Sequence, residues 1–116
     1  IASHHDFDAT PDDRILRMLM EQMQQGGADV AKLAVMPQNA DDVVRLLKLT
    51  NDMKQKYPTL PVVTMSMGAL GVVSRMAGEI FGSCITFGAV GETSAPGQIA
   101  ADKLEDILTV IHQGLC

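Results

Sequence analysis

The sequence predicts an α/β fold built on a parallel sheet, and three observations support this prediction. The 116 residues are 47% hydrophobic and 20% charged, a composition typical of one globular domain rather than of a disordered chain. Several short runs are almost continuously apolar, as in strands covered on both faces. These runs alternate with stretches of helical spacing, so the expected order is βαβαβαβα, built from right-handed βαβ units.

The first unit begins with the end of a strand at residues 1–3 (IAS) and continues with a helix. Residues 10–13 (TPDD) indicate the helix start, because Thr10 can cap it and two acids suit the positive end of its dipole. Gly26-Gly27 is expected to end this helix. Its apolar face, at helical spacing, consists of Ile15, Leu16, Leu19, Met20 and Met23.

The second unit combines a strand at residues 30–36 (VAKLAVM) with a helix that Asn39 is expected to cap. Tyr57-Pro58 is expected to end that helix, because the residue before a proline disfavours helical backbone. The apolar face of the helix consists of Val43, Leu46, Leu47 and Thr50.

The third unit is predicted as a strand at residues 60–67 (LPVVTMSM) followed by a helix over residues 70–81. Residues 84–90 (CITFGAV) predict a fourth strand, and residues 91–98 a polar loop rich in small residues. The helix over 70–81 has on one face Val73, Ala77 and Phe81. A last helix is marked by Leu104, Ile107, Leu108 and Ile111.

Four βα units in one domain leave two architectures open. They make about half of an eightfold βα barrel, which typically takes ~250 residues. An open, doubly wound sheet of four strands is the alternative, although no glycine fingerprint follows the first strand, which disfavours nucleotide binding. In both cases residues 1–116 are expected to form a four-stranded parallel sheet with helices.

Charge and composition exclude several classes of partner. The formal net charge is −5 and the 9 basic residues are spread without a cluster, which disfavours nucleic acid and anionic membranes. No apolar run approaches the ~20 residues of a transmembrane helix. The 2 cysteines, Cys84 and Cys116, make no disulfide framework, and Cys84 is expected to pack as a small hydrophobe. A cytoplasmic location is therefore expected.

Lys32 is the first candidate for chemistry, because it lies inside an apolar strand run. A lysine in a buried strand must be paired or must lose its charge, and a neutral amine can attack a carbonyl to form a Schiff base. A lysine whose end reaches solvent, or one in a structural ion pair, is the alternative.

Two adjacent histidines, His4 and His5, follow the first strand run. Successive strand residues point to opposite faces, so only one of the two can face a site with ease. Histidine is the natural proton shuttle near neutral pH, and a plain surface histidine is the alternative. No spacing of cysteines or carboxylates completes a zinc set around them, so no metal is expected.

Polar side chains also occur after the third and fourth strand runs. The planar fork of Arg75 suits a carboxylate or phosphate, and an ion pair with Glu79 is the alternative. Ser94 and Gln98 lie in the loop GETSAPGQ, which offers hydroxyl, amide and backbone donors. Loops of this kind are common, so this signal alone is weak.

Five stretches together resemble the type I 3-dehydroquinase family. They are SHHDF at 3–7, AKLAVMPQ at 31–38, TMSMGALGVVSRMAGE at 64–79, FGSCITFGAV at 81–90 and SAPGQ at 94–98. The match covers nearly the whole chain in one order, and these motifs would not recur together by chance. The resemblance implies units five to eight of a (βα)8 barrel, so residues 1–116 would be the C-terminal half of one barrel domain.

The resemblance implies a reaction, 3-dehydroquinate to 3-dehydroshikimate, and roles for individual residues. Lys32 would form the imine with the substrate ketone, and His5 would move protons because it directly precedes Asp6-Phe7. Arg75 would clamp the substrate carboxylate. The other residues expected to contact substrate are Ser94, Gln98, Met65, Met67, Phe7 and Phe87. For the two methionines, which share a strand face, core packing is the alternative. No metal and no organic cofactor is expected.

The family's first four units are absent from this sequence, which makes two further readings relevant. One is a half-barrel that self-associates without catalysis, through two strand edges left unpaired; the expected partner is a second copy or the missing N-terminal half. The other is a different lysine-imine barrel, such as a class I aldolase, against which HDF and SAPGQ argue.

Overall fold

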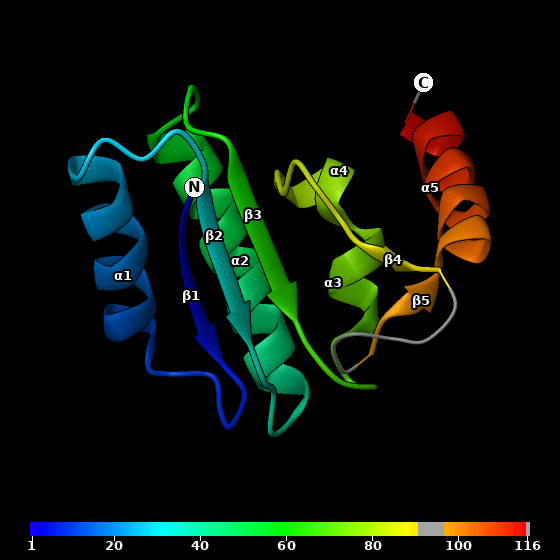
Figure 1. Cartoon of the computed structure of the whole chain (residues 1–116), viewed down its shortest axis with the longest axis horizontal. Helices are drawn as coiled ribbons and strands as arrows, with labels where there is room; N and C mark the ends of the chain where they lie inside the picture. Colours follow the sequence, from blue (N-terminus) through cyan, green and yellow to red (C-terminus); the bar gives the residue numbers. More distant parts are fainter. Residues whose placement is uncertain (91–96, 116) are drawn as a thin grey trace.

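The computed structural model describes residues 1–90 and 97–115 as an α/β arrangement with a parallel sheet (Figure 1). Its elements follow the chain as β1 (Ala2–Asp6), α1 (Asp13–Gln25), β2 (Ala31–Val35), α2 (Ala40–Lys56), β3 (Val62–Ser66), α3 (Val72–Met76), α4 (Gly78–Phe81), β4 (Gly88–Ala89), β5 (Ile99–Ala100) and α5 (Ala101–Leu115). The predicted alternation of strands and helices is confirmed from β1 to α3, whereas α3 is followed by a second helix and β4 by a second strand. Within these residues no helix is long and apolar enough to cross a bilayer.

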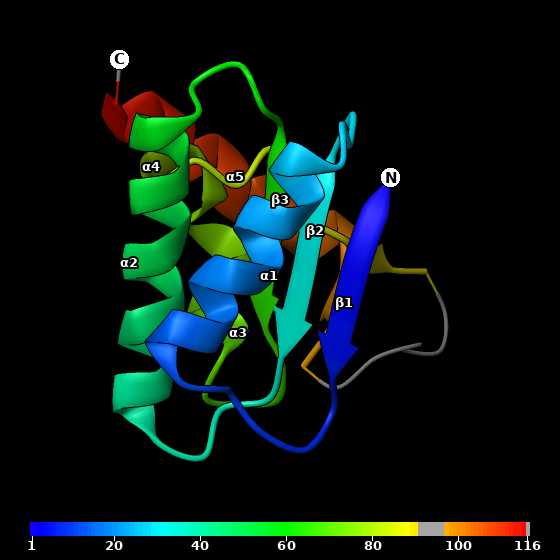
Figure 2. The same cartoon turned by 90° about the vertical axis from the view of Figure 1, so that its left-hand side faces the viewer.

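The sheet has the order β1-β2-β3, with all strands parallel. Helices α1 and α2 cover one of its faces (Figure 2). The side chains between these helices and the sheet form the larger core cluster, which is aliphatic and methionine-rich as the composition predicts: Leu16, Met20, Ala31, Leu33, Val35, Leu46, Leu49, Met53, Leu60 and Val62. The opposite face, which we call the second face, carries the alternate strand residues.

Most helix ends lie where the sequence predicts them. The Asn39 side chain accepts a hydrogen bond from the backbone N–H of Asp42 at 2.9 Å, and Tyr57 follows the last residue of α2. The expected cap of α1 is wrong, however. Asp12 caps this helix by accepting from the Arg14 N–H, whereas the buried Thr10 hydroxyl donates to the Met36 carbonyl at 2.9 Å. Burial under the next loop therefore takes Thr10 away from the helix.

The predicted four-stranded sheet is not confirmed, because the ladder contains three strands over the described residues. The chain after α4 meets β3 at a single bridge between Val62 and Ser83. The next backbone donor of β3, the N–H of Thr64, is bound by the Ser83 hydroxyl at 3.0 Å instead of by a strand carbonyl. A side chain thus occupies the donor that a longer ladder needs, and β4 pairs in parallel with β5 instead.

The single helix predicted over residues 70–81 is also wrong, because α3 and α4 are separated at Ala77. Gly78 begins α4 and faces the backbone of Ser83: a Cβ at Gly78 would lie 2.7 Å from the Ser83 oxygen. A glycine favours a helix less than other residues, and here it accommodates the returning chain. Apolar spacing gives no sign of such a close approach.

Gly71→Ala is expected to lower the free energy of unfolding by about 1–3 kcal/mol, the usual cost of overpacking. A Cβ at Gly71 would lie 1.9 Å from the Ser66 oxygen, so α3 would have to move away from the end of β3. The matched control is Gly114→Ala, because a Cβ there meets nothing within 4 Å. Urea unfolding followed by circular dichroism measures both; equal midpoints for the two variants would contradict the steric argument.

Candidate active site

The register of the sheet places the predicted lysine and one predicted histidine on the second face. Ser3, Lys32 and Val63 lie in one row across β1, β2 and β3. His5, Ala34 and Met65 lie two residues further along. Side chains two residues apart point to the same face, so Lys32 and His5 share it and His4 points to the opposite one. The amine and the imidazole thus stand on neighbouring strands and two residues apart in register, with His5 near the carboxyl end of β1 and Lys32 near the start of β2.

Lys32 is half-buried and lies beneath an aromatic ring. Its Nζ is 4.7 Å from the centroid of Phe87, which comes from the segment before β4. A cation over a ring face is attracted by about 0.5–1 kcal/mol where solvent reaches it and by more where it does not. This contact brings together two predicted site residues that are far apart in the sequence.

His5 also has an aromatic neighbour on the second face. Its ring stacks on that of Phe7, with centroids 6.0 Å apart and an interplanar angle of 11°. Both side chains are exposed, since β1 is the edge strand of the sheet. The imidazole can therefore exchange protons with solvent or with a ligand that lies over Lys32.

Arg75 lies in α3 with only 1% of its surface exposed. Its Nη1 donates toward the sulfur of Met65 at 3.6 Å, so the guanidinium reaches a residue of the second face. Burial lowers the pKa of this arginine, because the charged form loses solvent. Such burial disfavours the alternative of a surface ion pair with Glu79, which pairs instead with His112 at 2.5 Å.

The remaining predicted site residues differ in how closely the structure associates them with the second face. Met65 and Met67 are buried in the smaller core cluster of the second face, which is also what core packing requires. Gln98 follows Gly97, and a Cβ at Gly97 would lie 2.4 Å from the Gly68 oxygen, so this segment approaches the turn after β3. Ser94 lies outside the described residues. Over the part of the chain that is described, no group of three His, Cys, Asp or Glu side chains could hold a metal ion.

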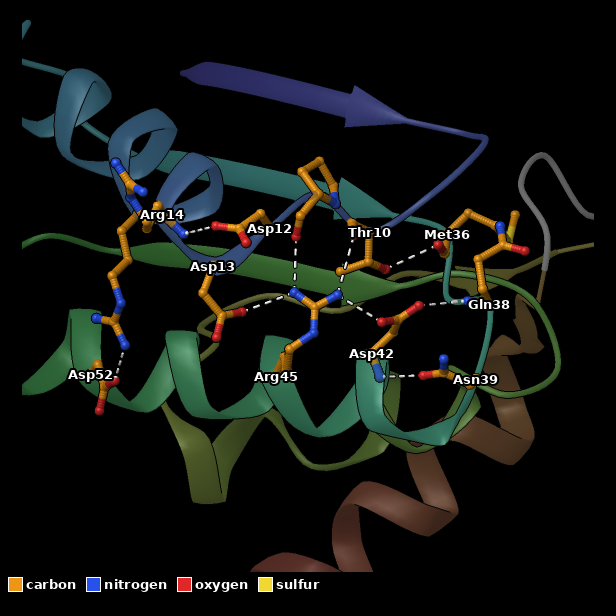
Figure 3. Close-up of polar contacts among 12 residues, drawn as sticks. Thr10, Asp12, Asp13, Arg14, Met36, Gln38, Asn39, Asp42, Arg45 and Asp52 are labelled. Carbon is orange, nitrogen blue, oxygen red and sulfur yellow. Dashed lines mark hydrogen bonds and ion pairs between the residues drawn. The ribbon is translucent and has the colours of Figure 1, made fainter.

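No sequence pattern indicates the polar contacts that join the loop after β1 to the loop after β2 (Figure 3). Arg45 of α2 is the centre of these contacts, and Asp42 and Thr10 take part in them. The partners are about 30 residues apart in the chain, at separations without any period. Only Asp42, three residues after the cap Asn39, had a local signal.

The fold and the second face together define a parallel α/β protein whose candidate reactive groups, an amine and an imidazole, share one face of two neighbouring strands. The family model described as type I 3-dehydroquinase matches residues 1–115. The chain belongs to the type I 3-dehydroquinase family.

Curated relatives and solved structures agree with this membership. A 3-dehydroquinate dehydratase of Bacillus licheniformis is 49% identical over 115 residues, which are 99% of this chain and 45% of that protein. One of Salmonella paratyphi B is 50% identical over 113 residues, or 97% of this chain and 45% of that protein. The chain thus spans less than half the length of these relatives.

Two solved structures give the same picture. The structure of a type I 3-dehydroquinate dehydratase from Clostridium difficile with covalent modified comenic acid matches with a TM-score of 0.90 and 48% identity, over 97% of this chain and 44% of that one. A 3-dehydroquinate dehydratase from Geobacillus kaustophilus matches with a TM-score of 0.91 and 41% identity, over 96% and 43% of the two chains.

Proposed function

We propose that residues 1–116 are the C-terminal half, units five to eight, of a single (βα)8 barrel domain. Three parallel strands in sequence order and the bridge at Ser83, where a fourth strand would begin, support this proposal. The coverage of 45% of the Bacillus licheniformis relative supports it as well. Short pairing at residues 84–90 is then the expected state of a strand whose outer neighbour belongs to the other half.

The proposed activity is the dehydration of 3-dehydroquinate to 3-dehydroshikimate through an imine on Lys32. The observation that carries it is the placement of Lys32 and His5 on one face, on neighbouring strands. The Clostridium difficile relative holds covalent modified comenic acid, which supports covalent chemistry on this fold. The proposed reaction uses no metal or organic cofactor, and the cytoplasmic location stays a prediction.

The Lys32 amine and the His5 imidazole are sufficient for every bond and proton change of the proposed dehydration. The Lys32 amine attacks the ketone carbon, and water leaves as the C=N bond forms. The protonated imine withdraws electrons, so His5 can remove the proton from the adjacent carbon. The electron pair of that C–H bond forms a C=C bond as the β-hydroxyl leaves with a proton, and hydrolysis of the imine then frees Lys32 and the enone product.

Other side chains are proposed to bind and orient the substrate. Arg75 would hold the carboxylate, because its fork suits a planar anion and its burial limits competition by water. The pocket for the substrate ring would be lined by Met65, Met67, Phe7 and Phe87. The loop that carries Ser94 and Gln98 would cover this pocket and donate hydrogen bonds to polar groups of the substrate.

Incubation of the chain with 3-dehydroquinate and borohydride tests the proposed function. Borohydride reduces an imine to a stable amine, so one adduct of the substrate is expected, mapped by peptide mass to Lys32. The test needs only the floor of the site and does not require turnover. Adducts on Lys48, Lys54, Lys56 or Lys103 with none on Lys32 would contradict the proposal.

A second candidate function is association without catalysis, and the exposed edge strand β1 favours it. Ile1 and Phe7 are 83% and 57% exposed, and one edge of β1 is unpaired in the described residues. Unpaired strand edges and apolar patches favour pairing with another chain. We propose that a second copy of the chain, or the N-terminal half of the family's barrel, covers this region.

Sedimentation at micromolar concentration is expected to show the isolated chain as a dimer or larger species. A two-fold pair could join β1 of each copy to the segment 84–90 of the other, or place the two second faces together. The expected mass is at least twice 12.4 kDa, with dissociation on dilution. A compact monomer at every concentration would contradict the association of copies.

A further inference from the structure

The loops that follow the two strands bearing Lys32 and His5 are tied together by one side chain of α2. We propose that Arg45 is a positioning residue, which sets the place of His5 relative to Lys32 by fixing the loop after β1. This inference rests on the proposed function for its catalytic consequence, and on the geometry of Figure 3 for the positioning itself.

Arg45 binds the loop after β1 with both arms of its guanidinium. Nη1 donates to the Pro11 carbonyl at 2.9 Å and to the carboxylate of Asp13 at 2.9 Å. Nη2 donates to the Thr10 carbonyl at 3.2 Å. The planar fork thus holds two successive backbone carbonyls, a geometry that an ammonium group cannot reproduce.

The same guanidinium also reaches the loop after β2, through Asp42. Nη2 donates to Asp42 Oδ1 at 2.6 Å, while Oδ2 of that carboxylate accepts the backbone N–H of Gln38 at 2.8 Å. The Gln38 N–H and Arg45 hold the pKa of Asp42 below its usual range, so the carboxylate stays ionised around neutral pH. The Asp42–Arg45 ion pair therefore connects the two loops, since Asp42 binds the loop after β2 and Arg45 binds the loop after β1.

Further bonds close the two loops on each other. Thr10 Oγ1 donates to the Met36 carbonyl at 2.9 Å, and the Met36 N–H donates to the Ala9 carbonyl at 3.2 Å. Asp6 Oδ1 accepts from the backbone N–H groups of Asp8 and Ala9, which shapes the turn directly after His5. A displacement of this loop must therefore reach the end of β1.

His5 is sensitive to such a displacement for two reasons. It lies on the edge strand, which has a ladder on one side only, whereas Lys32 lies on β2 between two ladders. Its ring stacks on Phe7, the first residue of the tied loop. Loss of the Asp42–Arg45 connection is therefore expected to move His5 and to leave Lys32 in place. A misplacement of a catalytic group by ~1 Å can lower the rate by about 100-fold.

Arg45→Lys is the test variant, and Arg17→Lys is its matched control. Arg17 also joins α1 to α2, through an ion pair with Asp52, which lies about two helical turns after Arg45 in α2. Thr10→Val is a second variant, because it removes only the hydroxyl bond to Met36 and leaves every charge in place. Circular dichroism selects a temperature at which all variants are folded.

Two readouts separate positioning from general loss of structure. The first is the NMR resonance of the His5 ring, assigned by His5→Ala; it is expected to shift in Arg45→Lys and Thr10→Val, and to stay unchanged in Arg17→Lys. The second is the ratio of enone formation to borohydride-trapped adduct on Lys32, expected to fall by about tenfold in Arg45→Lys, to fall in the same direction in Thr10→Val, and to stay unchanged in Arg17→Lys. Partial unfolding would lower enone formation and adduct yield together and would therefore leave their ratio unchanged.

An unshifted His5 resonance in Arg45→Lys, or an unchanged ratio, would overturn the inference. Absence of any adduct on the unsubstituted chain would overturn the proposed function alone, and the ring resonance would still decide the positioning. A His5 resonance that shifts as much in Arg17→Lys as in Arg45→Lys would mark a general effect of helix packing and would also overturn the inference.

Discussion

Lys32→Met is expected to abolish the borohydride-trapped adduct of 3-dehydroquinate. An imine needs a primary amine, and of the lysines Lys32 alone combines a place on the second face with a half-buried setting beneath Phe87. Methionine keeps most of the length and apolar stem of lysine, so the strand is expected to keep its packing. The readout is the intact mass of the reduced protein.

Lys103→Met is the matched control for this variant. Lys103 is an exposed residue of α5, and its loss is expected to leave the adduct yield unchanged. Full adduct on Lys32→Met would show that another amine reacts, and the proposed role of Lys32 would be wrong. Unfolding of the variant is recognised by circular dichroism before the trapping is interpreted.

His5→Ala is expected to slow enone formation by about 10²–10⁴-fold, the usual contribution of a positioned general base. The ring on the second face is lost, while the ladder between β1 and β2 uses only backbone groups and remains. The substrate must still reach Lys32, so a trapped adduct is expected to form. The measurement is the ultraviolet absorbance of the conjugated product.

The adjacent His4→Ala is the control, since it removes the same side chain from the opposite face. Its effect on enone formation is expected to stay within a few-fold, and any loss of stability is measured separately. Equal losses for His4→Ala and His5→Ala would contradict the assignment, because two neighbouring strand residues cannot both face the substrate.

Those parts of the fold that depend on local patterns could be predicted from the sequence. The apolar runs of β2 and β3 correspond to strands covered on both sides, and Asn39 caps α2 as expected. The pairing of the fourth predicted strand could not be predicted from the sequence. The run at 84–90 is apolar enough for a strand, but its pairing depends on the Ser83 hydroxyl and on what lies at its other edge.

The candidate site shows the same division. Alternation along a strand predicts that His4 and His5 face opposite ways, and the family motif selects His5. Only the register shows which face carries Lys32. The contact of Arg45 with Thr10 has no sequence signal, because it joins α2 to the loop of a different unit. The pair of Arg45 with Asp42 has helical spacing, but that spacing does not show that the pair connects two loops.

The central claim is that this chain is one half of a lysine-imine dehydratase, and complementation tests it most directly. The chain is mixed with a polypeptide covering the first four units of the Bacillus licheniformis relative, and product formation is compared with that of each part and of the intact relative. The chain alone is expected to be at least ~10²-fold slower than the intact enzyme, and the mixture to recover part of that loss. A mixture no faster than the chain alone, or a chain alone as fast as the intact enzyme, would contradict the claim.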